Sequence, residues 1–157
     1  MDNIISAERV IELAFADGGY IPKEIVSQAD IRLATERWVK PVVGQELLQR
    51  VLAGDYVELR EEYIVPVVAL YTRLVVQPKI NVMSSFGGLT SAHSSSRKAS
   101  DEASRKELQS RLREDAHSLL RALSDYLNQN QAQFKEYKKS ENILNRCSTD
   151  GGFVQIF

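Results

Sequence analysis

The sequence is poor in the residues that build metal and redox sites. Cysteine occurs once, at Cys147, which excludes an intramolecular disulfide and a cysteine-rich zinc site. The two histidines, His93 and His117, have no second ligand at a spacing that suits a metal. No stretch approaches the roughly 18 to 20 apolar residues of a membrane-spanning helix. We therefore expect no metal, no cofactor and no membrane span.

An excess of one sign of charge is also missing. Lysine and arginine total 20 and aspartate and glutamate 21, so no overall field attracts nucleic acid or an anionic membrane. The first fifteen residues mix charged with apolar positions, unlike a signal peptide, and we expect the protein to stay in the cytoplasm where it is made. A contact with DNA would have to be local. The candidate residues for it are Lys79, Arg97 and Lys98, for which a solvated surface is the simpler interpretation.

Catalytic motifs are absent from the sequence as well. His93 stands beside Ser94, but neighbours in a serine-rich loop lack the fixed geometry of a nucleophile and its base. The glycine pairs lack the lysine and the strand and helix context of a phosphate-binding loop. We therefore expect that the protein is not an enzyme.

The sequence does have the composition of one globular domain. Of its 157 residues, 43% are hydrophobic and 26% charged, which is enough to bury a core without disulfide or metal staples. Hydrophobic periodicity predicts a mainly α-helical bundle of four to five helices. The predicted helices cover residues 6–16, 22–39, 45–53, 55–76 and 100–130. The aromatic residues on their apolar faces, interpreted as core rather than as a base-stacking platform, include Trp38, Tyr63 and Tyr71.

Prolines set two of the predicted helix boundaries. Pro22 suits the first position of a helix, and Lys40-Pro41 should end that helix because a residue before proline is pushed out of the α region. Gly44 then provides a flexible joint before the next helix.

The predicted helix over residues 55–76 begins with a capping box. Asp55 is the expected N-cap, with Glu58 three residues later. The apolar run that follows should be kinked or restarted at Pro66 and ended by Gln77-Pro78. Because this run is rich in β-branched residues, a buried strand is an open alternative for it.

The longest predicted helix, residues 100–130, has the clearest pattern. Ser100 is its expected N-cap. Pairs of oppositely charged residues four apart with the acid first, such as Glu107 with Arg111, indicate a solvated face. The expected core stripe consists of Leu108, Leu112, Ala116, Leu119, Leu123 and Leu127, with Leu120 beside them.

Two segments have apolar residues and no core of their own. Residues 82–91 predict a small β-hairpin around Gly87-Gly88, and we expect a domain of residues 1–146 with this hairpin as an insertion at about 81–96. Residues 147–157 predict an extended C-terminal arm. Strand addition to a neighbouring chain would satisfy both segments. The candidate interface residues are Val82, Met83, Phe86, Gly87, Gly88, Leu89, Phe153, Val154, Ile156 and Phe157.

Residues 29–31 and 36–48 carry a resemblance to a known family. The second stretch reads ERWVKPVVGQELL, a helix that ends in Lys-Pro, two aliphatic residues and a glycine before the next helix. In this it resembles the head–tail connector (head-completion or adaptor) proteins of tailed bacteriophages and prophages. The order of the apolar helix over residues 64–76, the low-charge segment around Gly87-Gly88 and the helix start at Ala99-Ser100 is similar too.

The resemblance implies a structural virion protein. In that family, copies form a ring beneath the portal, around the channel through which DNA passes, and join the head to tail-side connector proteins. The alternative function is a prophage DNA-binding regulator, with residues 6–16 and the helix from Pro22 as a helix-turn-helix. The balanced charges of residues 23–40 argue against a recognition helix.

Overall fold

The computed structural model describes residues 4–16, 21–85 and 102–146, and within these ranges the protein is mainly helical, with no residue in a strand. The predicted helical bundle is thereby confirmed. Its α-helices are α1 (Ala7–Ala14), α2 (Gln28–Ala34), α3 (Lys40–Val43), α4 (Gln45–Leu52), α5 (Val65–Ser85) and α6 (Glu102–Gln129). Two π-helical turns, Thr35–Val39 and Leu59–Ile64, and three 3-10 turns, Lys23–Ile25, Gln131–Gln133 and Ile143–Asn145, complete the described elements.

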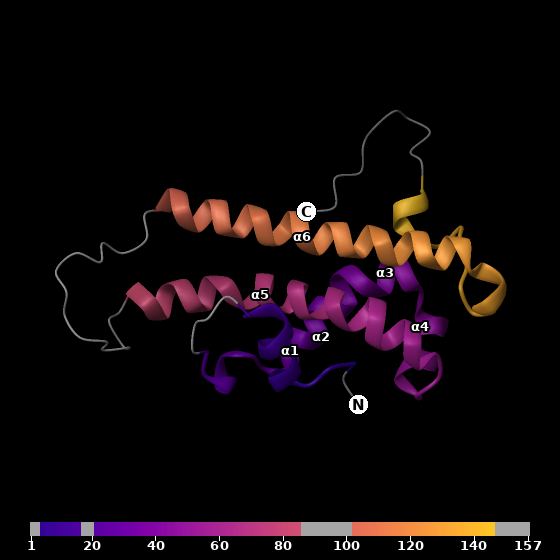
Figure 1. Ribbon diagram of the computed structural model, residues 1–157, viewed down its shortest axis with the longest axis horizontal. Coiled ribbons are helices and arrows are strands. Elements are labelled where there is room, and N and C mark those ends of the chain that lie inside the picture. The colour runs from indigo at the N-terminus through magenta and orange to yellow at the C-terminus, as the bar shows by residue number, and fades with distance from the viewer. Residues whose placement is uncertain (1–3, 17–20, 86–101, 147–157) are drawn as a thin grey trace.

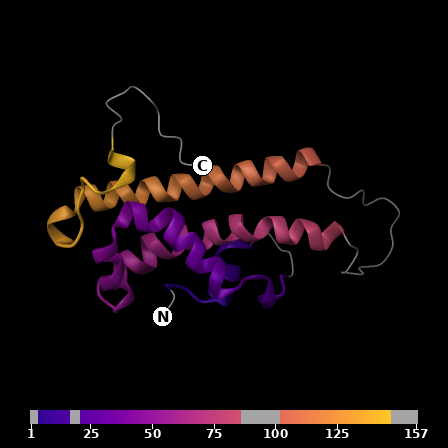
Figure 2. The ribbon, with the colours of Figure 1, turned by 180° about the vertical axis from the view of Figure 1, so that it is seen from behind.

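The long helices α5 and α6 form the frame of the molecule. They lie side by side and run in opposite directions, with α1 and α2 against the side of α5 that faces away from α6 (Figures 1 and 2). The short helices α3 and α4 lie near the C-terminal end of α6 (Figure 1). Apolar side chains from all six helices join one buried cluster. Since apolar burial is the main favourable term in folding, this cluster holds the six helices together.

The buried stripe of α6 follows the helical period closely. Leu112, Ala116, Leu120, Leu123 and Leu127 are buried at spacings of four, four, three and four residues. The prediction that Leu119 belongs to this stripe is wrong, because its side chain is 37% exposed. One residue along a helix turns the side chain by about 100°, so Leu119 and Leu120 cannot both face the same neighbour.

Each π-helical turn stands directly before a proline. Thr35–Val39 precedes Lys40-Pro41, and Leu59–Ile64 precedes Val65-Pro66. In both, the residue before the proline donates its N–H five residues back, from Lys40 to Thr35 and from Val65 to Arg60. The wider turn moves the carbonyl that the proline ring would meet, which is why the chain stays helical. The predicted break at Lys40-Pro41 is therefore wrong, and Gly44, with a φ of 86°, makes the break instead.

The predicted helix over residues 22–39 is divided. Lys23–Ile25 is a 3-10 turn, Val26 is extended, and α2 begins only after its N-cap Ser27. Ser27 and Asp30 form a capping box, which gives α2 a start that the apolar pattern alone did not reveal.

The start of the next helix also differs from the prediction. The first helical hydrogen bond runs from the N–H of Arg60 to the carbonyl of Tyr56 (3.0 Å), and the carboxylate of the predicted N-cap Asp55 lies 3.5 Å from a guanidinium nitrogen of Arg50. Tyr56 adopts a φ of 55°, unusual for a residue with a side chain. Its ring packs edge-on against Phe134 at 5.1 Å between centroids, so a tertiary contact fixes this turn.

The helix α5 continues past its predicted end. Pro78 lies inside it, and the helix runs on to Ser85. Pro78 has no N–H to donate to the helix, but packing holds the helix on both sides of it. The two residues before it, Val76 and Gln77, are buried, and Lys79 after it forms an ion pair with Asp30. The predicted first strand of the hairpin is accordingly wrong for residues 82–85, which are helical, whereas residues 86–96 lie outside the described residues.

Candidate partner-binding surface

The two predicted contact segments leave the fold at opposite ends of α6. Residues 86–101 join Ser85 to Glu102, so they leave at the end where α5 stops and α6 starts (Figure 1). The arm that begins at Cys147 follows Arg146, which comes directly after the 3-10 turn Ile143–Asn145. Asn145 is hydrogen-bonded to Asn128 near the other end of α6. The 26 residues from Glu102 to Asn128 span about 39 Å at about 1.5 Å per residue.

A network of buried amides fixes the chain in front of the C-terminal arm. Asn142, 1% exposed, donates to the hydroxyl of Ser124 at 2.8 Å and to the hydroxyl of Tyr137 at 2.7 Å. Tyr137 donates in turn to the side-chain carbonyl of Asn128 at 2.8 Å, and Asn128 and Asn145 exchange two hydrogen bonds of 2.9 Å. A satisfied buried network is rigid, so the origin of the arm has a defined place on α6.

Sequence reasoning missed this network. The segment after Phe134 reads as polar and charged, yet Phe134, Tyr137 and Asn142 are buried. The available signal was the presence of aromatic residues close to asparagines in this segment. Asparagine side chains are costly to bury unless they find hydrogen-bond partners.

The structure describes few of the predicted interface residues. Val82 lies on α5 and is 54% exposed. Met83 lies in the last turn of α5. The predicted positions outside the described residues are Phe86, Gly87, Gly88, Leu89, Phe153, Val154, Ile156 and Phe157, together with Arg97 and Lys98 of the predicted DNA contact.

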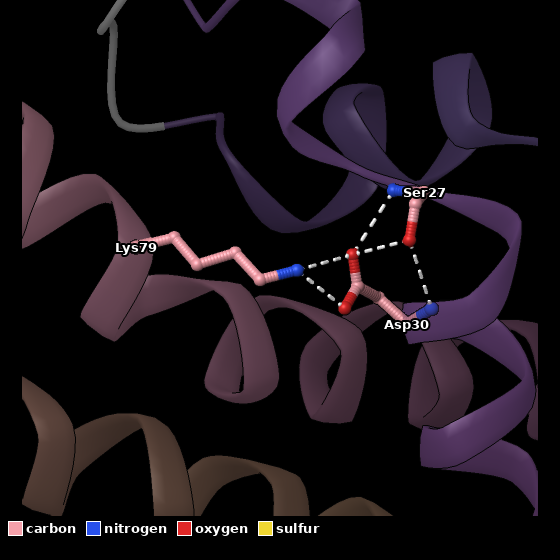
Figure 3. Close-up of polar contacts among 3 residues, drawn as sticks. All are labelled: Ser27, Asp30 and Lys79. Carbon is pink, nitrogen blue, oxygen red and sulfur yellow. Dashed lines mark hydrogen bonds and ion pairs between the residues drawn. The ribbon is translucent and has the colours of Figure 1, made fainter.

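Lys79, the third residue of the predicted DNA contact, forms an ion pair within its own chain. Its ammonium lies 2.7 and 2.9 Å from the two carboxylate oxygens of Asp30 (Figure 3). Asp30 also accepts from the backbone N–H and the hydroxyl of Ser27, at 3.1 and 2.7 Å. Burial alone would raise the pKa of Asp30, but the hydrogen bonds from Lys79 and Ser27 outweigh it and hold the pKa below its usual value.

Two arginines hold the N-terminal residues against the continuous helical stretch of residues 57–85, which also contains Lys79. Arg60 donates to the carbonyl of Ile4 at 3.2 and 2.8 Å, and Arg73 donates to the carbonyl of Ala14 at the end of α1. The guanidinium of Arg73 also lies 4.7 Å from the ring centroid of Phe15. Arg73 and Lys79 thus join α1 and α2 to α5, and Arg60 holds the residues before α1 to the π-helical turn that precedes α5.

Aromatic and acidic side chains gather near the C-terminal end of α6. The rings of Tyr63 and Tyr126 stack at 4.0 Å between centroids and 18° between planes, and both residues are half-buried. Burial raises the pKa of Tyr126, and the nearby Glu58, Tyr63 and Glu62 raise it further. We call Glu58, Glu62, Tyr63 and Tyr126 the acidic–aromatic face.

The segment after α6 makes polar contacts at the same end of the molecule. Tyr56 donates to Glu136 at 2.9 Å, and Lys138 lies 2.9 Å from Glu46 on α4. The hydrogen bond from Tyr56 lowers the pKa of Glu136, and the same bond raises the pKa of Tyr56.

Metal-ligating side chains do not cluster in the part of the chain that the structure describes. Within residues 4–16, 21–85 and 102–146, no group of three or more His, Cys, Asp or Glu side chains could hold a metal ion. His117 accepts from the guanidinium of Arg121 at 3.0 Å, and burial followed by the charge of Arg121 lowers its pKa. None of the described helices is both long and apolar enough to span a membrane.

Comparison with known proteins gives a family but no role. A family model described as "Family of unknown function (DUF6712)" matches residues 36–146, more than half of the 157-residue chain. The match begins in the π-helical turn before α3, so α1 and α2 lie outside it. No curated protein and no solved structure matches the chain.

Proposed function

The chain belongs to this family of unknown function (DUF6712), and we propose that it is a structural virion protein resembling a phage head–tail connector. In this proposal copies of the chain form a ring under the portal and join the DNA-filled head to the tail. The partners are other copies, the portal protein and tail-side connector proteins, and no catalytic step is involved. The protein assembles in the host cytoplasm and ends at the head–tail junction.

The observation that carries the proposal is the placement of the two contact segments. Residues 86–101 and the arm from residue 147 leave from opposite ends of α6, about 39 Å apart by helix length. A subunit with different contact segments at its two ends joins its neighbours head to tail. Such heterologous contacts close into a ring when the rotation between subunits allows it.

The rest of the fold suits the rigid body of such a subunit. The helix α6 has a buried stripe along α5, and the amide network around Asn142 fixes the origin of the arm. Val82 provides an exposed apolar side chain near the other end. These features support contacts between chains rather than a pocket for a small molecule.

Contact with passing DNA is a minor part of the proposal. Lys79 is 54% exposed, but its ammonium is already paired with Asp30, so it is a weak phosphate ligand in this conformation. The DNA contact would then depend on Arg97 and Lys98, through charge alone and without sequence preference, and only in copies in which these two residues form no ion pair with protein.

Truncation of the arm tests the proposal. A chain that ends at Asp150 keeps every buried residue that the structure describes, so its helical signal and melting temperature should match those of the full chain. It should nevertheless fail to enter virions when it replaces the full chain. A matched control is Leu33→Ser, which changes an apolar side chain that is 49% exposed on α2 and should leave incorporation unchanged.

Two results would count against the proposal. Complete, infectious particles built with the truncated chain would remove the role of the arm. Tight binding of a short DNA duplex by the isolated protein, with an affinity that falls steeply as salt rises, would favour the helix-turn-helix alternative.

A further inference from the structure

We propose that the acidic–aromatic face is the docking site for the basic segment around Arg97 and Lys98 of a second copy of this chain. This inference rests on the proposed function and deepens it, because it names the surface that receives a neighbour and the chemistry of what is received. The face itself consists of described residues: Glu58, Glu62, Tyr63 and Tyr126.

The face has the chemistry of a cation site. Glu58 and Glu62 are exposed and four residues apart, at the start of the helical stretch that contains the π-helical turn Leu59–Ile64. Among the residues that the structure describes, no cation forms an ion pair with either of them, whereas their neighbour Glu61 lies 3.8 Å from Arg60. The stacked rings of Tyr63 and Tyr126 lie beside this negative charge. A guanidinium or ammonium placed there would pair with one or both carboxylates and lie close to the stacked rings.

The segment that joins α5 to α6 has the complementary charge. Residues 84–100 contain no aspartate or glutamate and hold two formal positive charges, those of Arg97 and Lys98. The attraction between this segment and the face is therefore not offset by acidic residues within the segment.

The segment cannot reach the face of its own chain. Arg97 is five residues from Glu102, and five extended residues span at most about 18 Å. From Glu102 to Tyr126, α6 spans 24 residues, or about 36 Å. The remaining gap of about 18 Å equals the reach of about five further extended residues, which one side chain does not cover. A segment that docks on this face therefore comes from another copy.

Contacts of this kind have a direction. Each subunit would donate its basic segment from one end of α6 and accept a neighbour's segment at the other end. This is a heterologous contact, which repeats from copy to copy and closes into a ring or extends as a filament.

A peptide titration tests the proposal without a portal or a particle. The probe is a fluorescently labelled peptide with the sequence of residues 89–100, titrated with the full chain. The expected result is saturable binding, with proton NMR shifts in the rings of Tyr63 and Tyr126. Binding should weaken by about tenfold or more in Glu58→Lys/Glu62→Lys.

Two further variants separate charge recognition from damage to the fold. The matched control, Glu24→Lys/Asp115→Lys, reverses two exposed acids elsewhere and should bind the peptide within about twofold of the natural chain. A peptide carrying Arg97→Glu and Lys98→Glu should not bind the natural chain but should bind Glu58→Lys/Glu62→Lys. This restoration by charge exchange would not follow from a merely structural role of the two glutamates.

Three results would overturn the proposal: no ring shifts at millimolar peptide, equal binding by Glu58→Lys/Glu62→Lys, or a peptide that binds a DNA duplex and leaves the protein unchanged. The test is independent of the virion. Peptide binding by a protein that never enters particles would support the contact and refute the proposed function, and a connector without peptide binding would do the reverse.

Discussion

Replacement of Asp30 by asparagine should loosen the N-terminal helices from α5. The change keeps the shape of the side chain but removes the charge that receives Lys79 at 2.7 and 2.9 Å and Ser27 at 2.7 and 3.1 Å. Asp30 is 7% exposed, so water cannot replace these partners without local opening of the fold.

The magnitude follows from two contributions. Ser27 still caps α2 through the backbone N–H of residue 30, so the loss is limited to the charge-assisted half of the capping box, the hydrogen bonds that Ser27 donates to the carboxylate, about 0.5–2 kcal/mol of unfolding free energy. Because the side chain of Lys79 is 54% exposed, the ion pair is screened and adds at most about 1 kcal/mol. We expect a total of about 0.5–3 kcal/mol, which for a chain of this size lowers the melting temperature by about 1–12 °C.

The effect of Asp30→Asn should depend on pH in a defined direction. The folded protein holds the pKa of Asp30 below its usual value, so the ionised carboxylate stabilises the fold above the unfolded pKa of about 3.9. This contribution disappears as the pH falls through the lower folded pKa. The natural chain and Asp30→Asn should therefore differ at pH 7 and converge in strong acid.

Urea denaturation at a series of pH values measures this difference. The control is Glu8→Gln, which removes an exposed ion pair with Lys23 (3.2 Å) and should change the unfolding free energy by less than about 0.5 kcal/mol. The reasoning is refuted if Asp30→Asn behaves like this control, or if its effect is the same at pH 3 as at pH 7.

Two further predictions concern α6 and the chain that follows it. Leu123→Ala should destabilise the fold by about 2–5 kcal/mol because Leu123 is fully buried, whereas Leu119→Ala should cost less than about 0.5 kcal/mol; equal effects in thermal melts would contradict the assignment of the two faces of α6. Tyr137→Phe removes a partner of both Asn142 and Asn128 and should cost about 1–3 kcal/mol in urea denaturation, with faster amide hydrogen exchange in residues 137–146; unchanged exchange would show that the network does not hold this segment.

The elements whose apolar residues repeat at the helical period were predictable from the sequence. The stripe of α6 predicts the buried face and the C-terminal end of that helix, whereas its predicted N-cap Ser100 lies outside the described residues. Gly44, with a φ of 86°, marks the start of α4 as expected, and Gly54, with a φ of 100°, follows its end. Only Leu119 was assigned to the wrong face, by a single step of about 100°.

Prolines account for two of the misplaced boundaries. A proline in a helix normally costs several kcal/mol, so Lys40-Pro41 and Gln77-Pro78 predict helix ends. In this protein a π-helical turn accommodates Pro41, and packing on both sides holds the helix through Pro78. Neither compensation has a local sequence signal, because each depends on what the rest of the chain packs against.

The candidate surfaces were predictable only in part. The missing charge of residues 84–96 and the apolar residues after position 152 mark two segments that need partners, and both stay predictions. The acidic–aromatic face was not foreseen, because Tyr63 and Tyr126 are 63 residues apart in sequence and only the fold stacks them. The amide network around Asn142 was missed for the same reason.

The central claim is that copies of this chain join head to tail through the two ends of α6. An electron-microscopy map of assembled particles tests it most directly. The account predicts a ring of copies at the portal vertex, in which the segment between α5 and α6 of each copy contacts the C-terminal end of α6 in the next. Particles that lack the chain, or a ring in which copies meet through α1 and α2 while both ends of α6 contact only solvent, would contradict it.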